Sequence, residues 1–281
     1  MNRGSCLCGG VQFEAGPFDS MVHCHCSMCR KHHGAMFAPF LTGSADSFRW
    51  LAGEKRVAVY HSSDKGLRPF CRDCGSVAPT ALPALGVAFV PAGNLEGDPG
   101  MRPERHMFAA SRAEWFPIAD ALPQHDGFPP GFEDSEAVDN PHPPSKPGIV
   151  QGRCLCGAVA FELAGVPDRL HNCHCSRCRR ARSAAHATNA FYPRERFAWL
   201  SGEADVVSFA LPGAKRFGQA FCRHCGSAVP RVVPSTGYVV VPCGSLDDPP
   251  GMPVASHIFV GSKAPWFEIT DHLPQWETLP A

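Results

Sequence analysis

Two clusters of three cysteines are the residues of this sequence best suited to do chemistry. The members of these cysteine trios are Cys24, Cys26 and Cys29 in the first half, and Cys173, Cys175 and Cys178 in the second. The C-x-C-x2-C spacing lets three thiols close around one metal ion, and catalytic zinc typically has three protein ligands and an open fourth position. We therefore expect each trio to hold zinc and to take water, a substrate sulfur or a protein histidine as the fourth ligand.

Two larger cysteine sets predict closed metal sites. Their members are Cys6, Cys8, Cys71 and Cys74 in the first half, and Cys154, Cys156, Cys222 and Cys225 in the second. Each set combines a C-x-C pair with a distant C-x2-C-G knuckle, in which glycine permits a tight turn. A filled tetrahedron leaves no place for substrate, so we expect these sites to be structural. The sequence thus predicts four zinc ions per chain, two structural and two in open sites. Disulfides and iron–sulfur clusters are the alternatives.

A histidine that closed a trio would make that site structural. The histidines near the trios are His23, His25, His32, His33, His171, His174 and His186. None is clearly placed to close both trios: Asn172 stands where the first half has His23, and His25 lies between two ligands, where the side chain tends to face away. An open position accepts a further sulfur, and metal binding favours the thiolate, which is the nucleophilic form.

Basic residues directly follow each trio. They are Arg30, Lys31, Arg179 and Arg180. We expect them to offset the negative charge of zinc bound to three thiolates, or to hold a carboxylate of the incoming ligand. Solvated surface charge is the alternative.

The chain carries a long internal repeat. The stretch around Cys6 and Cys8 returns around Cys154 and Cys156, and the F-C-x2-C-G-S knuckle also occurs twice. A period of this length indicates domain duplication. Proline and glycine are dense between the copies, which favours an extended linker. We therefore expect copy one over 1–126, a linker over 127–147 and copy two over 148–281.

Strand signals outnumber helical ones in each copy. Alternating or β-branched segments predict strands at 10–15, 56–60, 87–90 and 106–108 in copy one, and at 158–163, 206–209, 238–241 and 257–260 in copy two. Only 27–33 and 176–182, after the trios, favour a short helical turn. The sequence predicts a mainly β fold in which zinc knuckles join strand ends.

Composition limits the partners. The 281 residues have a formal net charge of +0, so no basic field favours nucleic acid. No apolar run reaches the roughly 18 residues that span a bilayer, which predicts no membrane partner. The N-terminus lacks the apolar core of a signal peptide, so we expect a reducing cytoplasm.

Several other residues have plainer expected roles. Cys243 should be a buried thiol without a counterpart, and His106 and His257 satisfied core histidines. Asp120 and Asp271 should form turns. The recurring tryptophans should anchor the core or the domain interface; they are Trp50, Trp115, Trp199 and Trp266.

The motifs G-x-C-x-C-G, C-H-C-S-x-C-R and F-C-x2-C-G-S together resemble the glutathione-dependent formaldehyde-activating enzyme family, also called the centromere protein V domain family. The resemblance covers both copies. It implies an Mss4-like, zinc-ribbon-related β fold in each, with structural roles for the four-cysteine sets and catalytic roles for the trios. It also implies carbon–sulfur lyase activity that joins glutathione to formaldehyde. The chain departs from the family pattern in being duplicated, so that the copies can pack as an intrachain pseudo-dimer, and in having Ser183 where copy one has Gly34.

The main hypothesis is a zinc-dependent carbon–sulfur lyase whose partners are a small-molecule thiol, with glutathione as the expected co-substrate, and an aldehyde or thiol adduct. One alternative is a non-catalytic zinc module that binds proteins. Another is a zinc enzyme of the same fold that acts on a different small metabolite.

Overall fold

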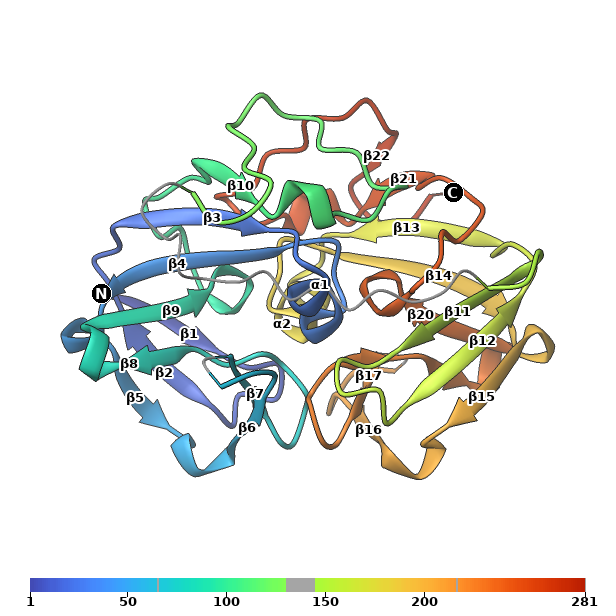
Figure 1. The fold of residues 1–281 in the computed structure, drawn as a ribbon, viewed down its shortest axis with the longest axis horizontal. Helices are drawn as coiled ribbons and strands as arrows, with labels where there is room; N and C mark the ends of the chain where they lie inside the picture. The colour runs from blue at the N-terminus through green and yellow to red at the C-terminus, as the bar shows by residue number, and fades with distance from the viewer. Residues whose placement is uncertain (65, 130–144, 216, 281) are drawn as a thin grey trace.

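The computed structural model shows two halves of similar build lying side by side, with the only two α-helices of the described chain meeting between them (Figure 1). The structure describes all residues except 65, 130–144, 216 and 281. The expected linker over 127–147 falls largely on 130–144, outside the described residues. The mainly β fold and the arrangement in two domains are confirmed.

Each half is built from short strands. Copy one contains β1 Asn2–Ser5, β2 Gln12–Ala15, β3 Ser20–Cys24, β4 Ala38–Ser44, β5 Arg49–Ala52, β6 Val57–His61, β7 Leu67–Cys71, β8 Thr80–Leu82, β9 Val87–Pro91 and β10 Arg105–Met107. Copy two contains β11 Ile149–Arg153, β12 Ala160–Ala164, β13 Arg169–Cys173, β14 Ala187–Pro193, β15 Phe197–Ser201, β16 Val206–Ala210, β17 Gly218–Cys222, β18 Ala228–Val229, β19 Arg231–Val233, β20 Tyr238–Pro242, β21 Ser256–Ile258 and β22 Gln275–Trp276.

The largest sheet of each copy positions its trio. In copy one the strand order is β10-β3-β4-β9-β8, and in copy two it is β19-β20-β14-β13-β21-β22. Most neighbours are antiparallel, but β10 runs parallel to β3, and β21 runs parallel to β13. The interior strands β3 and β13 end on Cys24 and Cys173, so the first cysteine of each trio lies at the carboxyl end of a strand that is paired on both sides.

The two helices are α1, Ser27–His33, and α2, Ser176–Arg182. Each begins at the residue that follows the second cysteine of its trio. Cys26 caps α1, and its sulfur accepts a hydrogen bond from the backbone N–H of Cys29 at 3.3 Å. The helix ends at Gly34, which adopts a left-handed backbone conformation with φ of 62°. Ser183 takes the same place after α2 with φ of 52°, so the loss of glycine leaves this turn in the same backbone region.

One continuous apolar core joins the copies. Met21, Phe37 and Leu41 of copy one belong to the same buried cluster as Tyr192 and Trp266 of copy two. The other recurring tryptophans pack partly buried against this cluster, which confirms them as core anchors; they are Trp50, Trp115 and Trp199. Cys243 also lies in this cluster and is 1% exposed, as expected of a buried thiol.

Polar contacts add to the interface between the copies. Gln219 donates to the carbonyl oxygen of Cys74 at 2.9 Å, and the ring Nδ1 of His32 lies 3.1 Å from the carbonyl oxygen of Cys225. Each cysteine knuckle is therefore tied to the other copy through its backbone. No helix in the described part of the chain is long and apolar enough to cross a membrane.

Candidate metal centres

The four-cysteine sets are assembled as the spacing predicts. The sulfur atoms of Cys6 and Cys8 are 3.3 Å apart, and those of Cys8 and Cys71 are 3.8 Å apart. A tetrahedral ion with metal–sulfur bonds of about 2.3 Å separates its sulfurs by roughly 3.8 Å. All these cysteines are free thiols, and the separations far exceed the roughly 2.05 Å of a disulfide. The set therefore fits a thiophilic metal ion.

Copy two repeats this arrangement. The sulfurs of Cys154 and Cys156 are 3.5 Å apart, and those of Cys156 and Cys222 are 3.7 Å apart. Hydrogen bonds from the thiols of Cys154 and Cys222 lower the pKa of Cys156 to about 7. The same crowding raises the pKa values of Cys154 and Cys222, so the thiols of this set strongly influence one another's ionisation.

The trios lie at the strand-to-helix turns. In copy one, Cys24 ends β3, Cys26 caps α1 and Cys29 lies in the first turn of the helix. The three sulfurs lie within 4.8 Å of one another, as do those of the copy-two trio. Among the residues that the structure describes, no histidine or carboxylate joins either group of sulfur donors. The donor set in each copy therefore leaves a fourth coordination position to a group from outside the trio.

Two of the histidines near the copy-one trio, His25 and His33, form hydrogen bonds away from the sulfurs. The ring nitrogens His25 Nε2 and His106 Nδ1 lie 2.8 Å apart, and His106 Nε2 lies 2.9 Å from a carboxylate oxygen of Asp120. The ring Nδ1 of His33 lies 2.9 Å from the carbonyl oxygen of Arg182, in the other copy. The expectation that His25 faces away from the sulfurs is thus confirmed.

Copy two has the same chain of side chains. His174 Nε2 and His257 Nδ1 are 2.8 Å apart, and His257 Nε2 lies 3.0 Å from Asp271. Burial lowers the pKa of His25 to about 3 and that of His174 to about 2, so both rings are neutral. The aspartates also accept from backbone N–H groups two residues later, in the expected turns. Their bonds to histidine were not foreseen, because the pairs lie 14 residues apart without a motif.

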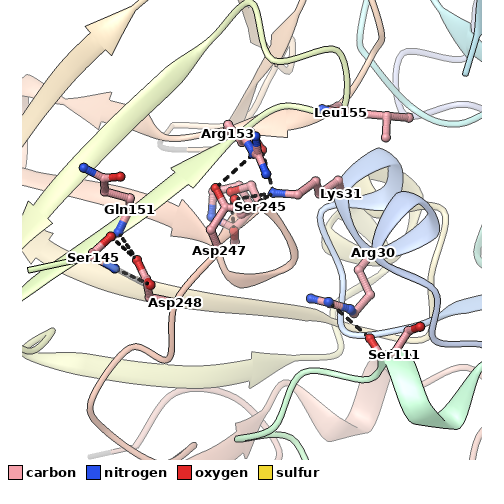
Figure 2. Close-up of polar contacts among 12 residues, drawn as sticks. Arg30, Lys31, Ser111, Ser145, Gln151, Arg153, Leu155, Ser245, Asp247 and Asp248 are labelled. Atoms are coloured by element: carbon pink, nitrogen blue, oxygen red, sulfur yellow. Dashed lines mark hydrogen bonds and ion pairs between the residues drawn. The ribbon is translucent and has the colours of Figure 1, made fainter. Parts of the chain in front are cut away.

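Lys31 lies at the interface between the copies, where its ammonium contacts residues of copy two (Figure 2). Its ammonium lies 2.6 Å from a carboxylate oxygen of Asp247 in copy two, and both side chains are 4% exposed. It also donates to the carbonyl oxygens of Arg153 and Ser245. The expectation that Lys31 offsets the trio's charge or holds a ligand carboxylate is therefore corrected.

The other basic residues that follow the trios are partly buried. Arg30 donates to the carbonyl oxygen of His25 at 3.3 Å. It also donates to the carbonyl oxygen of Ser111 at 3.3 Å (Figure 2). These contacts brace the loop that carries the trio. Arg179 and Arg180 lie in α2. A role of Arg30, Arg179 and Arg180 in ligand binding stays a prediction.

Different cations lie beside the sulfurs. In copy one, Arg68 on β7 points its Nη1 at the sulfur of Cys29, 3.5 Å away. Hydrogen bonds from Cys24 and Cys26, and then the charge of Arg68, hold the pKa of Cys29 well below its ordinary value. No sequence pattern marks Arg68, because it precedes the distant knuckle and lies 39 residues from Cys29.

In copy two the cations come from other positions. Gln219 stands where copy one has Arg68, and it accepts a hydrogen bond from Arg182 at 2.9 Å. Burial lowers the pKa of Arg182 to about 10, and the charge of Cys178 opposes that shift. Burial also lowers the pKa of Arg231, and the charge of Cys178 again opposes the shift. Each trio therefore has guanidinium groups nearby, supplied by different elements.

A cavity of about 220 Å³ adjoins the copy-two trio. The cavity is lined by two cysteines of the trio, Cys173 and Cys178, and by the basic residues Arg182 and Arg231. Phe191 adds an aromatic wall. The cavity thus offers sulfur ligands, positive charge and apolar surface to one small molecule.

Comparison with known proteins identifies the family of this chain. The sequence profile described as "Glutathione-dependent formaldehyde-activating enzyme" matches residues 1–111 and 149–262. A search of curated proteins gave no match. Among solved structures, a Rhodobacter sphaeroides protein studied by structural genomics is 26% identical. The match covers 34% of this chain and 89% of that one, with a TM-score of 0.28. On the profile matches, which span most of both halves, this chain belongs to the glutathione-dependent formaldehyde-activating enzyme family as a tandem duplicate.

Proposed function

We propose that the chain is a zinc-dependent carbon–sulfur lyase that joins a thiol to an aldehyde, or releases the aldehyde from the adduct. Glutathione is the proposed thiol and formaldehyde the proposed aldehyde, because the family is described by that activity. The observation that carries the proposal is the pair of trios, in which sulfur donors stand without a fourth protein ligand among the described residues.

The thiolate-rich donor sets fit zinc. Cys24, Cys26 and Cys29 would hold one open-site ion, and Cys173, Cys175 and Cys178 the other. The two four-cysteine sets would hold structural ions. When bound at a trio, zinc supplies a free coordination position and favours the thiolate form of an incoming thiol.

Guanidinium groups of the chain then offset negative charge near each trio. Arg68 in copy one, and Arg182 in copy two, reduce the negative charge that a further thiolate would meet at the trio. In the adduct-forming direction, the thiolate sulfur bonds to the carbonyl carbon. The π electron pair moves to the carbonyl oxygen, which takes up a proton. The reverse direction breaks the same carbon–sulfur bond.

The copy-two cavity favours an anionic thiol. Arg182 and Arg231 line it together with the trio, so a ligand could place its sulfur at the metal and a carboxylate near a guanidinium. Glutathione carries both groups. The free thiols throughout the chain accord with a reducing compartment, and we propose the cytoplasm.

Replacing the middle cysteine of each trio tests the proposal. The variants are Cys26→Ser, Cys175→Ser and the double variant, with Cys243→Ala as the control because copy one has Ala92 at that position. The assay measures the rate of adduct formation from glutathione and formaldehyde above the uncatalysed rate. We expect each single variant to lose one copy's share, the double variant to fall to background, and the control to keep its rate.

Retention of the full rate by the double variant would exclude catalysis at the trios. Background activity in the wild type with all candidate thiols would favour the non-catalytic zinc module instead. Circular dichroism before the assay checks that the four-cysteine sites still hold the fold.

A further inference from the structure

A second kind of donor group lies on copy one, near the boundary between the copies. We propose that His23, His106 and Asp120 form a nitrogen- and oxygen-ligated site for a divalent transition-metal ion such as zinc, separate from the cysteine sites. Their donor atoms all lie within 4.8 Å of one another.

The sheet brings the two histidines together. Strands β3 and β10 run parallel, and His106 pairs directly with His23 in their register. Paired residues on neighbouring strands project from the same face. Asp120 approaches the same point, with its two carboxylate oxygens 2.9 and 3.1 Å from His106 Nε2. A tetrahedral ion with bonds of about 2.1 Å separates its ligands by roughly 3.4 Å, so the carboxylate would need to withdraw by only about half an ångström.

His23 is the residue that points to a missing ligand. It is 3% exposed, and its Nε2 has no hydrogen-bond partner among the described residues. The Phe37 ring, 4.4 Å away between centroids, offers this nitrogen no hydrogen bond. Coordination of an ion would satisfy this buried nitrogen.

The surroundings match those of metal-bound histidines. With His106 Nε2 on an ion, its Nδ1–H would donate to His25 Nε2, 2.8 Å away. Such an outer hydrogen bond fixes the tautomer of ligating histidines in metalloproteins. A cavity of about 50 Å³, bordered by both copies, adjoins all three residues. It has room for water to complete the coordination.

Copy two lacks one of these donors. It has the same pair, His257 and Asp271, but Asn172 stands at the position of His23. The amide oxygen of Asn172 accepts a hydrogen bond from Thr188 at 2.7 Å and is therefore satisfied. Among the residues that the structure describes, the nitrogen and oxygen donor group occurs on copy one alone. Two imidazoles and a carboxylate are ligands typical of zinc with an open position, and also of iron(II).

Counting metal ions in matched variants tests the site. Full-length protein is saturated with zinc, freed of excess by gel filtration and analysed by mass spectrometry of its metals. The variants are His23→Asn, which copies the residue found in copy two, and Asp120→Asn; the control is Asp271→Asn, the same change at the equivalent position. We expect both variants to hold one zinc ion fewer per chain than wild type, and the control to match wild type.

Cobalt distinguishes this site from the cysteine sites. Cobalt bound to thiolates shows sulfur-to-metal charge transfer, which a site without sulfur lacks. We expect His23→Asn to bind one cobalt fewer with an undiminished charge-transfer band. Equal metal counts in wild type and His23→Asn would overturn the proposal, as would loss of charge transfer in step with the lost ion. Since the readout is a difference between variants, it holds even if the trios prove inactive. Should His23→Asn fail to fold, Asp120→Asn against Asp271→Asn gives the same comparison.

Discussion

At the residue scale, the ion pair between Lys31 and Asp247 crosses the interface between the copies with both side chains buried. Removing one partner of a buried pair leaves an uncompensated charge and typically costs about 3–5 kcal/mol. Without Lys31, the buried Asp247 would keep only the longer ion pair with Arg153, at 3.4 Å, so we expect Lys31→Met to lower the free energy of unfolding by up to about that amount. Urea denaturation of the zinc-loaded protein measures the change.

The control for this change is Arg56→Ala. Arg56 pairs with Asp73 at 2.7 Å, but the side chains are 57% and 38% exposed. Exposed pairs contribute about 0–1 kcal/mol. A loss below about 1 kcal/mol in Lys31→Met would contradict a buried, charged pair.

Arg68 should set how firmly the copy-one trio holds metal. Replacing it with glutamine, the residue of copy two at this position, removes the cation 3.5 Å from Cys29. The Cys29 thiol would then keep its proton to a higher pH, so protons compete better with the metal. We expect roughly 10- to 100-fold weaker zinc binding at one site, as is usual for residues that contact metal ligands. The pH at which this zinc is lost should also rise.

Competition with a chromophoric chelator, at several pH values, measures that affinity. Arg49→Gln is the control, because Arg49 bonds Glu14 and lies in a different sheet from Arg68. An unchanged affinity and an unchanged pH midpoint in Arg68→Gln would mean that the guanidinium does not act on the thiolates.

At the element scale, each short helix ends against a tight turn of the other copy. A Cβ atom built on Gly93 would lie 2.2 Å from the backbone nitrogen of Ala184, just after α2. The equivalent Gly244 faces the backbone nitrogen of Ala35, just after α1, at 2.3 Å. Only glycine lets these backbones approach so closely.

We therefore expect Gly93→Ala to destabilise the protein by at least about 1–3 kcal/mol, the usual cost of overpacking, because backbone atoms cannot yield as a side chain can. Differential scanning calorimetry measures the fall in melting temperature. Gly97→Ala is the matched control, since its Cβ would meet nothing within 4 Å. If Gly93→Ala and wild type had equal melting temperatures, the turn would accommodate the added Cβ atom without loss of stability.

Local patterns predicted the elements that local chemistry determines. Alternation indicated β2 and β9, and the stretch after each trio indicated α1 and α2 over the observed residues. The sequence did not predict β3, because its residues Ser20–Cys24 end in a metal motif and show no clean alternation. The parallel pairing of β3 with β10 joins segments about 80 residues apart, and no local signal specifies such a register.

The same distinction between local and long-range signals applies to the site residues. Sulfur ligands close in sequence, or in C-x2-C knuckles, are visible from spacing alone. Arg68 and Asp120 reach their partners only through strand pairing and turns, so no motif marks them. For Lys31 the sequence was misleading. Its proximity to Cys29 in sequence suggested a role at the trio, but in the fold its ammonium pairs with Asp247.

At the scale of the whole molecule, the two copies share one core and cannot be independent units. The buried cluster contains Phe13 and Leu41 of one copy together with Phe161 and Tyr192 of the other. Separating the halves would expose this surface to water. The two copies are thus repeats in sequence, but we expect them to fold together as one unit.

We expect the fragments 1–126 and 148–281 to assemble when produced together, and to aggregate or self-associate when produced alone. Size-exclusion chromatography with light scattering gives the masses. A folded, monomeric 1–126 with the melting temperature of the intact chain would contradict the shared core. Adding back the missing fragment to the self-associated one is the control for irreversible damage.

Phe37 and His186 occupy equivalent positions in the two copies, and their rings meet edge to face with centroids 5.6 Å apart. In a symmetric homodimer, a residue beside the twofold axis meets its own duplicate, so phenylalanine faces phenylalanine and histidine faces histidine. Covalent fusion removes that constraint. The seam of this chain can combine unlike side chains, and a polar group introduced on one side need not be matched by an identical, competing group on the other.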